Sequence, residues 1–343
     1  MNRRERLEHA RRAEPCGRTP FVPSIYEHGA AVLGRGPGEV SRDARLMAQA
    51  ALESYSRYGH DLVTVGIDIY NVEAEAWGCR ISKGEGASIP GVTTHPLGEF
   101  PDLDPARLRE PVPGEGNRLM LMAEAAGTVA GAIGDEVWVY ACLGGPFSQA
   151  VELRGFDNLI VDMHTTPDRV HVLLERLTET TLKHARRVSE RNAGVYLYES
   201  WATAPLITLD IFRDYVTPYN KRIVQGVKAE YPAVPPPSVI MGGDVTLLGD
   251  LFLDMGVSLV AVDYLADFVA LREKFDGTGT IVRGCADPKM IERGDWDGLE
   301  RMLEQLAGKA RGMYNFVWGC GCVSYTTPEE HLLRFKSLCE GLR

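Results

Sequence analysis

The stretch LVTVGIDI, residues 62–69, decides the fold class of this chain. It is almost continuously apolar and rich in β-branched residues, without the alternation of a sheet that faces water on one side. Runs of this kind are typical of parallel strands that are buried on both faces. Asp68 is the second-last residue of this run, where a parallel strand would end and a loop would begin.

Seven further runs of the same character occur along the chain, at residues 19–25, 137–143, 195–201, 238–244, 259–265, 280–286 and 315–321. Amphipathic helical patterns separate them, most clearly at 168–192 and 296–313. Eight strand-and-helix repeats predict an α/β fold, a (β/α)₈ TIM barrel. The alternative is an open doubly wound sheet, which would need a Gly-rich phosphate turn that residues 25–34 do not provide.

A length of 343 residues is within reach of one large barrel, so we expect a single domain over residues 1–343. The segment at about 79–118 interrupts the rhythm, because it is rich in Pro and Gly and only weakly periodic. So long a stretch in a compact domain is either a lid over the site or an extended surface wrap. Both interpretations remain open at this point.

Charge and cysteine usage limit the function classes. The net charge is −10 with no basic block, which argues against nucleic acid and anionic membranes as partners. No apolar run reaches the roughly 18 residues of a membrane span, and the basic start lacks the apolar middle of a signal peptide. Seven scattered cysteines do not suggest a disulfide framework, so we expect a cytoplasmic protein with reduced thiols.

Barrels of this kind carry their chemistry at the carboxyl ends of the strands. Asp68 and Glu199 are the candidate catalytic residues, because a carboxylate in an apolar strand is costly to desolvate unless it has a partner or a task. The candidate substrate-binding residues are the other polar or small residues at predicted strand ends, His28, Gly242, Gly243 and Asp263. The two glycines would leave room for a large flat ligand.

Three cysteines, Cys285, Cys320 and Cys322, end two predicted strands that neighbour each other. Adjacent strands lie about 5 Å apart, so the thiols could converge on one ion. Thiolates are preferred ligands of Zn²⁺, and the sequence therefore predicts a metal site here. The alternative is core filling, since a free cysteine behaves as a small apolar residue.

Five motifs, taken in order, resemble the uroporphyrinogen decarboxylase superfamily. They are NRRERLEHARRAEPCGRTPFVP (2–23), YGHDLVTVGIDIYNVEAEAWGC (58–79), GGPFSQAVELRGFDNL (144–159), RGCADPKMIERGDWDGLE (283–300) and WGCGCVSYTTPEEH (318–331). The resemblance runs nearly end to end and implies a (β/α)₈ barrel. One branch of the superfamily decarboxylates uroporphyrinogen without a cofactor. The other moves methyl groups between a corrinoid protein and a small acceptor such as coenzyme M, using zinc.

The chain resembles the methyltransferase branch more closely. The decarboxylases carry arginines just after the first strand, and residues 24–34 contain none. The decarboxylases have a Gly-His-Gly motif near the end of the chain, and residues 319–321 of this sequence are Gly-Cys-Gly instead. Of the decarboxylase features only Asp68 is present, at the position of the essential carboxylate. The resemblance therefore implies a corrinoid (cobalamin) protein and a small methyl donor or acceptor as partners, with the chain a monomer or homodimer. A decarboxylase acting through Asp68 is the alternative, and a non-catalytic barrel that delivers a corrinoid domain is a third.

The implied zinc site is incomplete in this sequence. The methyltransferases hold zinc with His-x-Cys on the fifth strand and a Cys on the eighth. Cys320 matches the last ligand, but Ile240 and Gly242 stand where His and Cys are expected. Either the metal has moved to Cys285, Cys320 and Cys322 with a carboxylate such as Glu199 or Asp244, or the site is metal-free. In the second case a general acid, Asp68 or Glu199, would assist the leaving group.

Overall fold

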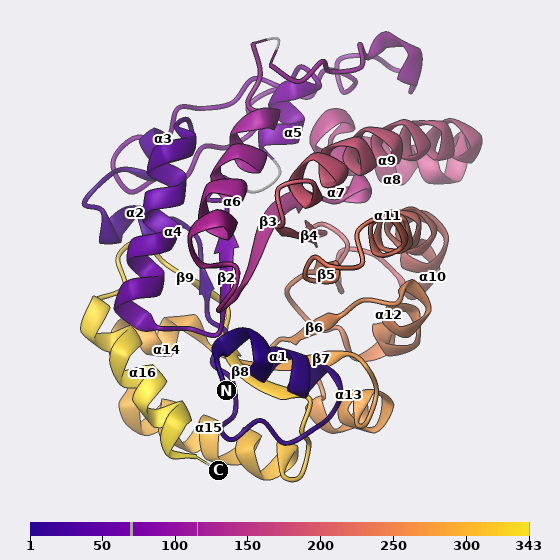
Figure 1. Cartoon of the computed structure of the whole chain (residues 1–343). Coiled ribbons are helices and arrows are strands. Elements are labelled where there is room, and N and C mark those ends of the chain that lie inside the picture. Colours follow the sequence, from indigo (N-terminus) through magenta and orange to yellow (C-terminus); the bar gives the residue numbers. More distant parts are fainter. Residues whose placement is uncertain (69–70, 115, 343) are drawn as a thin grey trace.

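The computed structural model describes residues 1–68, 71–114 and 116–342. In these residues parallel strands alternate with helices around a barrel, which Figure 1 shows with the helices outside. The strands are β1 (Ser24–Ile25), β2 (Leu62–Val65), β3 (Trp138–Gly144), β4 (Gly194–Tyr198), β5 (Ser238–Ile240), β6 (Leu259–Val262), β7 (Ile281–Ala286), β8 (Phe316–Cys320) and β9 (Cys322–Val323).

The strands pair in parallel, in the orders β2-β3-β4-β5, β6-β7-β8 and β1-β9. Side chains bridge two of the seams between these sheets. Ser238 Oγ accepts a hydrogen bond from Leu259 N at 3.1 Å between β5 and β6, and Thr64 Oγ1 donates to Ile25 O at 3.3 Å between β2 and β1. The chain therefore forms the predicted (β/α)₈ barrel, and the open doubly wound sheet is wrong.

The helices are α1 (Arg3–Arg11), α2 (Glu27–Val32), α3 (Pro37–Val40), α4 (Ala44–Tyr58), α5 (Asn71–Ala76), α6 (Leu119–Ile133), α7 (Pro146–Arg154), α8 (Phe156–Thr165), α9 (Pro167–Ser189), α10 (Leu209–Ile211), α11 (Thr217–Glu230), α12 (Gly249–Met255), α13 (Phe268–Phe275), α14 (Pro288–Arg293), α15 (Trp296–Ala310) and α16 (Glu329–Gly341). The helical patterns at 168–192 and 296–313 correspond to α9 and α15. Asp295 caps α15 by accepting a hydrogen bond from Gly298 N at 3.1 Å.

Each of the eight predicted runs contains strand residues or bridge pairing, but most strands end earlier than the apolar pattern. The run at 238–244 yields a strand only to Ile240, because Gly243 adopts a φ of 77° and turns the chain. The run at 19–25 pairs at Phe21 and then at Ser24–Ile25. Ile69, the last residue of the run at 62–69, lies outside the described residues.

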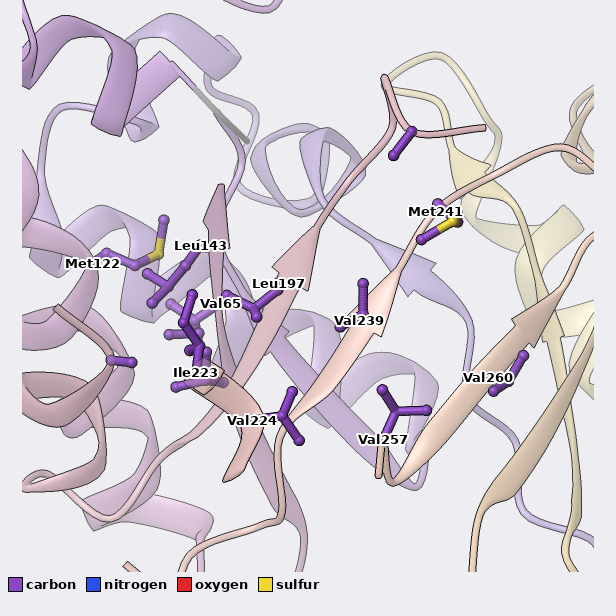
Figure 2. Packing of buried hydrophobic residues seen from close by; sticks show 14 of the residues in the cluster. Val65, Met122, Leu143, Leu197, Ile223, Val224, Val239, Met241, Val257 and Val260 are labelled. Carbon is purple, nitrogen blue, oxygen red and sulfur yellow. The ribbon is translucent and has the colours of Figure 1, made fainter. Parts of the chain in front are cut away.

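Two apolar layers hold the barrel together, because successive side chains of a strand point to opposite faces. The outer layer lies between strands and helices, and Figure 2 shows part of it, with Val65, Leu143, Leu197 and Val239 from four strands near Met122, Ile223 and Val224. The inner layer includes Trp138, Tyr140 and Tyr196, with Leu7 of α1. In Figure 1, α1 lies across the barrel at the end where the strands begin.

Most of the described residues of the 79–118 segment are exposed or half-buried. The segment contains a short 3₁₀ turn, Pro105–Arg107. Arg154 of α7 fastens the segment by donating to the carbonyls of Leu97 at 2.6 Å, Phe100 at 2.7 Å and Pro101 at 3.1 Å. Within the described part of the chain, no helix is both long and apolar enough to cross a bilayer.

Candidate functional site

A cavity of about 1050 Å³ opens at the carboxyl ends of the strands. Residues that follow or end the strands line it, among them Tyr26, Ile67, Tyr198, Met241, Asp263, Cys285 and Cys322. Part of the 79–118 segment, at residues 89–92, also lines it. The place agrees with the general position of active sites in this fold.

The walls of the cavity are mainly apolar and aromatic. Phe156 and Trp201 stack with ring centroids 5.8 Å apart, and both line the cavity with Tyr264. Trp201 Nε1 donates to Glu152 Oε1 at 2.8 Å, which fixes the indole ring. A small organic molecule with an apolar body therefore fits these walls, with the few polar groups left to orient it.

Four of the predicted site residues line the cavity: Gly242, Asp263, Cys285 and Cys322. A Cβ built on Gly242 would meet no atom within 4 Å, so this glycine does leave open space. Asp263 accepts a hydrogen bond from Leu265 N at 3.0 Å, which commits one carboxylate oxygen to the turn after β6.

Asp68 lies behind the cavity wall. It accepts a hydrogen bond from Arg118 Nη1 at 2.5 Å and another from the amide of Asn71. The same Asn71 amide lines the cavity and donates to Pro90 O at 2.7 Å. Asp68 thus positions Asn71 and, through it, the part of the 79–118 segment that covers the cavity.

Glu199, a predicted catalytic residue, caps the start of α7. It is fully buried and accepts hydrogen bonds from Phe147 N at 3.2 Å, Ser148 N at 2.8 Å and Asn220 Nδ2 at 2.9 Å. The Glu199 carboxylate thereby satisfies the free N–H groups at the start of α7. A Cβ on Gly145 would lie 2.3 Å from the Glu199 carboxyl, so the glycine is needed for this approach. Burial still raises the pKa of Glu199.

His28 and Gly243 also have structural surroundings. The buried imidazole of His28 bonds Tyr58 Oη at 2.8 Å and Ser324 O at 3.2 Å. Gly243 has its positive φ in a tight turn, where a Cβ would lie 2.5 Å from Thr203 Oγ1. Neither residue is among the described residues that line the cavity.

The structure does not bring the three predicted metal ligands together. Cys285 and Cys322 line the cavity, whereas Cys320 lies in the outer apolar layer, near Cys339 of α16. Alternation along β8 turns Cys320 outward, and the strand is interrupted at Gly321, so Cys320 and Cys322 do not share a face. Convergence of the thiols on one ion would have required an uninterrupted strand at Gly321, so that Cys320 and Cys322 shared a face.

The side chains present do not fit a zinc site. Among the described residues, no group of three or more His, Cys, Asp or Glu is placed to hold a metal ion. Ile240 and Gly242 line the cavity at the positions where the resemblance expects His and Cys. Burial raises the pKa of the Cys285 thiol.

Sequence reasoning did not select four polar residues of the cavity: Tyr26, Glu27, Tyr198 and Arg283. The hydroxyls of Tyr26 and Tyr198 are hydrogen-bonded, with the rings edge to face at 5.7 Å. Glu27 is half-buried, and burial raises its pKa. The sequence did contain a signal for Arg283. It lies two residues before Cys285, so the two side chains point to the same face of β7.

Comparison with known proteins agrees with this architecture. A family model described as uroporphyrinogen decarboxylase (URO-D) matches residues 2–341. Among solved structures, a methyltransferase from Methanosarcina mazei has a TM-score of 0.83 at 20% identity and covers 99% of each chain. At this identity the likeness shows the shared fold.

Two curated relatives represent the two activities of the family. The chain is 27% identical to a methylcobamide:CoM methyltransferase of Methanosarcina mazei over 348 residues, which is 99% of this chain and 98% of the relative. It is 29% identical to a uroporphyrinogen decarboxylase of Saccharopolyspora erythraea over 303 residues, 82% of this chain and 78% of the relative.

Proposed function

The chain belongs to the uroporphyrinogen decarboxylase (URO-D) family, and from this premise we propose that it moves a methyl group between a small methylated compound and a corrinoid held by a partner protein. The match to a methylcobamide:CoM methyltransferase along almost the whole of both chains supports this branch. The observation that carries the proposal is the cavity, which has largely apolar and aromatic walls and, among its described lining residues, one arginine and one lysine, Arg283 and Lys289. A substrate with many carboxylates would need a larger set of cations.

When bound at the cavity mouth, the partner's corrinoid supplies the centre that takes or gives the methyl group. The residues of this chain hold the small molecule and supply the proton that its leaving group needs. Because no zinc site fits, the proposal contains no step at a metal held by this chain. We therefore favour a donor in which the methyl group is bonded to oxygen. The oxygen leaving group needs a proton, and the reaction does not depend on a deprotonated thiol.

Glu27 is the proposed proton donor. It lines the cavity, and burial raises its pKa, which keeps the carboxyl protonated to higher pH than an exposed glutamate. As the methyl–oxygen bond breaks, Glu27 gives its proton to the leaving oxygen, and the partner's corrinoid, in its reduced state, would supply the electron pair that accepts the methyl group. Asp68 acts from behind the wall, as the positioning residue of Asn71.

The 79–118 segment is the proposed lid, because residues 89–92 line the cavity and Asn71 binds the Pro90 carbonyl. We place the reaction in the cytoplasm, and the seven free cysteines support a reducing compartment. The proposed assembly is a monomer or a homodimer that binds the corrinoid protein at the cavity mouth.

The decarboxylase alternative rests on Asp68. Its carboxylate is occupied by Arg118 and Asn71 and is not among the described residues of the cavity wall, which weakens that alternative. Incubation with uroporphyrinogen tests it, since release of carbon dioxide would favour decarboxylation.

A cobalamin assay tests the methyl-transfer proposal. The purified protein is incubated either with methylcobalamin and 2-mercaptoethanesulfonate, or with reduced cobalamin and a panel of methyl ethers. We expect a change in cobalamin absorbance that depends on the protein, and a loss of about a hundredfold in Glu27→Gln. No change with any pair of substrates, at protein concentrations sufficient for single turnover, would refute the proposal.

A further inference from the structure

Arg283 is a buried cation whose charge is not neutralised by an ion pair within the described part of the chain. It lies on β7, points into the barrel and lines the floor of the cavity, with only 4% of its surface exposed. Its Nε atom is buried and has no hydrogen-bond partner among the described residues. An isolated buried charge is strongly unfavourable unless something compensates for it.

Among the described residues, two other arginines are buried, and they show how this chain compensates such a charge. Arg118 pairs with Asp68 at 2.5 Å and also with Glu75. Arg154 pairs with Asp162 at 2.6 Å and binds three backbone carbonyls as well. Arg283 differs from both, and it is the one of the three that faces the cavity.

The neighbours of Arg283 do not replace a counter-ion. The groups whose charges act most on it are Cys285, Tyr26, Tyr196 and Tyr198. Burial raises the pKa of each phenol and of the thiol, so all four are neutral at neutral pH. Asp263 is within electrostatic range, but within the described residues it forms no ion pair with Arg283, and it accepts a hydrogen bond from Leu265 N.

The barrel is built to hold the Arg283 side chain in this place. A Cβ on Gly319 of the adjacent β8 would lie 2.6 Å from Arg283 Cδ and 2.7 Å from Cγ. Any larger residue at position 319 would therefore displace the side chain. Together, the room at Gly319 and the missing counter-ion indicate a binding group and not an accident of packing.

We propose that Arg283 binds an oxyanionic group of the small-molecule substrate, a carboxylate or a sulfonate, at the floor of the cavity. The planar guanidinium matches such a group with two parallel hydrogen bonds. The apolar walls formed by Phe156 and Trp201 then contact the body of the molecule. This inference rests on the proposed function, because it names the substrate class of that same site.

Calorimetric titration with matched probes tests the inference without any need for turnover. The probes are 4-methoxybenzoate, 4-methoxybenzenesulfonate and neutral 4-methoxybenzamide, with 3-(methylthio)propanoate, 2-(methylthio)ethanesulfonate and 3-(methylthio)propanamide as an aliphatic set. We expect an anion of at least one set to bind about thirtyfold or more tightly than its amide. The preferred anion distinguishes a carboxylate from a sulfonate site.

Variants assign the preference to Arg283. Arg283→Gln should lose it, Arg283→Lys should keep part of it, and Lys289→Gln, at the exposed rim of the cavity, should change it less than about threefold because solvent screens that charge. Circular dichroism confirms folding of each variant. Equal binding of anions and amides by the wild-type protein, no binding of any probe, or an anion preference that survives in Arg283→Gln would each overturn the inference.

The outcome is separable from that of the proposed function. An anion preference without methyl transfer would refute the methyltransferase and keep the binding site. Methyl transfer by a protein that binds anions and amides equally would keep the methyltransferase and refute the binding site.

Discussion

Arg118 Nη1 lies 2.5 Å from Asp68 Oδ2, in a buried ion pair behind the wall of the cavity. The pair joins residues 50 positions apart in the chain and fixes Asn71, which binds the covering segment through Pro90 O. Asp68, the acidic residue for which the sequence gives the clearest signal, therefore supports the site and is not among the described residues that line the cavity.

Asp68→Asn should lower the free energy of unfolding by about 3 kcal/mol, because it leaves the Arg118 guanidinium with Glu75 as its only carboxylate partner. Urea unfolding monitored by circular dichroism measures this change. Glu39→Gln, which removes an exposed pair with Arg35, is the matched control and should cost less than about 1 kcal/mol. Equal effects of the two substitutions would show that the buried pair has no special weight.

The pH dependence of methyl transfer should carry the signature of Glu27. Burial raises the pKa of this carboxyl, so the protonated acid is present at low pH and is lost as the pH rises through the raised pKa. The rate should therefore fall on the alkaline side of that value. This fall in rate at alkaline pH should be absent in Glu27→Gln and should remain in Asp263→Asn. An unchanged fall in rate in Glu27→Gln would exclude this residue as the proton donor.

Arg283→Met should leave the ligand-free protein as stable as the wild type or more stable, by up to about 2 kcal/mol, because it removes an unpaired buried charge. Arg154→Met is the contrasting control. It strands Asp162 and three carbonyls and should cost about 3 kcal/mol or more. Thermal unfolding compares the two variants. A strong destabilisation by Arg283→Met would mean that the arginine has a structural partner.

Cys320→Ser should leave methyl transfer within about twofold of the wild type and should lower stability by about 1–3 kcal/mol, because it buries a hydroxyl in the outer apolar layer. Metal analysis after purification without chelators should give less than about a tenth of an equivalent of zinc in the wild type. A full equivalent of zinc that is lost in Cys320→Ser would contradict the placement of this thiol.

The barrel was predictable because its signal is repeated and local. Each apolar run and each amphipathic segment indicates its own element, and eight repeats leave few arrangements. The caps were equally local: Asp287 and Asp295 each accept a backbone hydrogen bond within the next three residues.

The site was less predictable, because it depends on side-chain direction and on distant partners. A one-residue difference along β8 decides that Cys320 faces the helices while Gly319 faces Arg283. Glu199 and Glu27 are the same residue type near strand ends, yet one meets the start of α7 and the other an open cavity. The periodicity of apolar residues in the sequence does not predict these side-chain contacts.

The transfer of a labelled methyl group tests the central claim most directly. Reduced cobalamin is incubated with the protein and a pool of methyl ethers, methylated amines and thioethers that carry deuterated methyl groups, and the cobalamin is analysed by mass spectrometry. We predict that deuterated methylcobalamin forms with the wild-type protein and that its formation is much slower with Glu27→Gln. Unlabelled cobalamin throughout, together with release of carbon dioxide from uroporphyrinogen by the same preparation, would contradict the account.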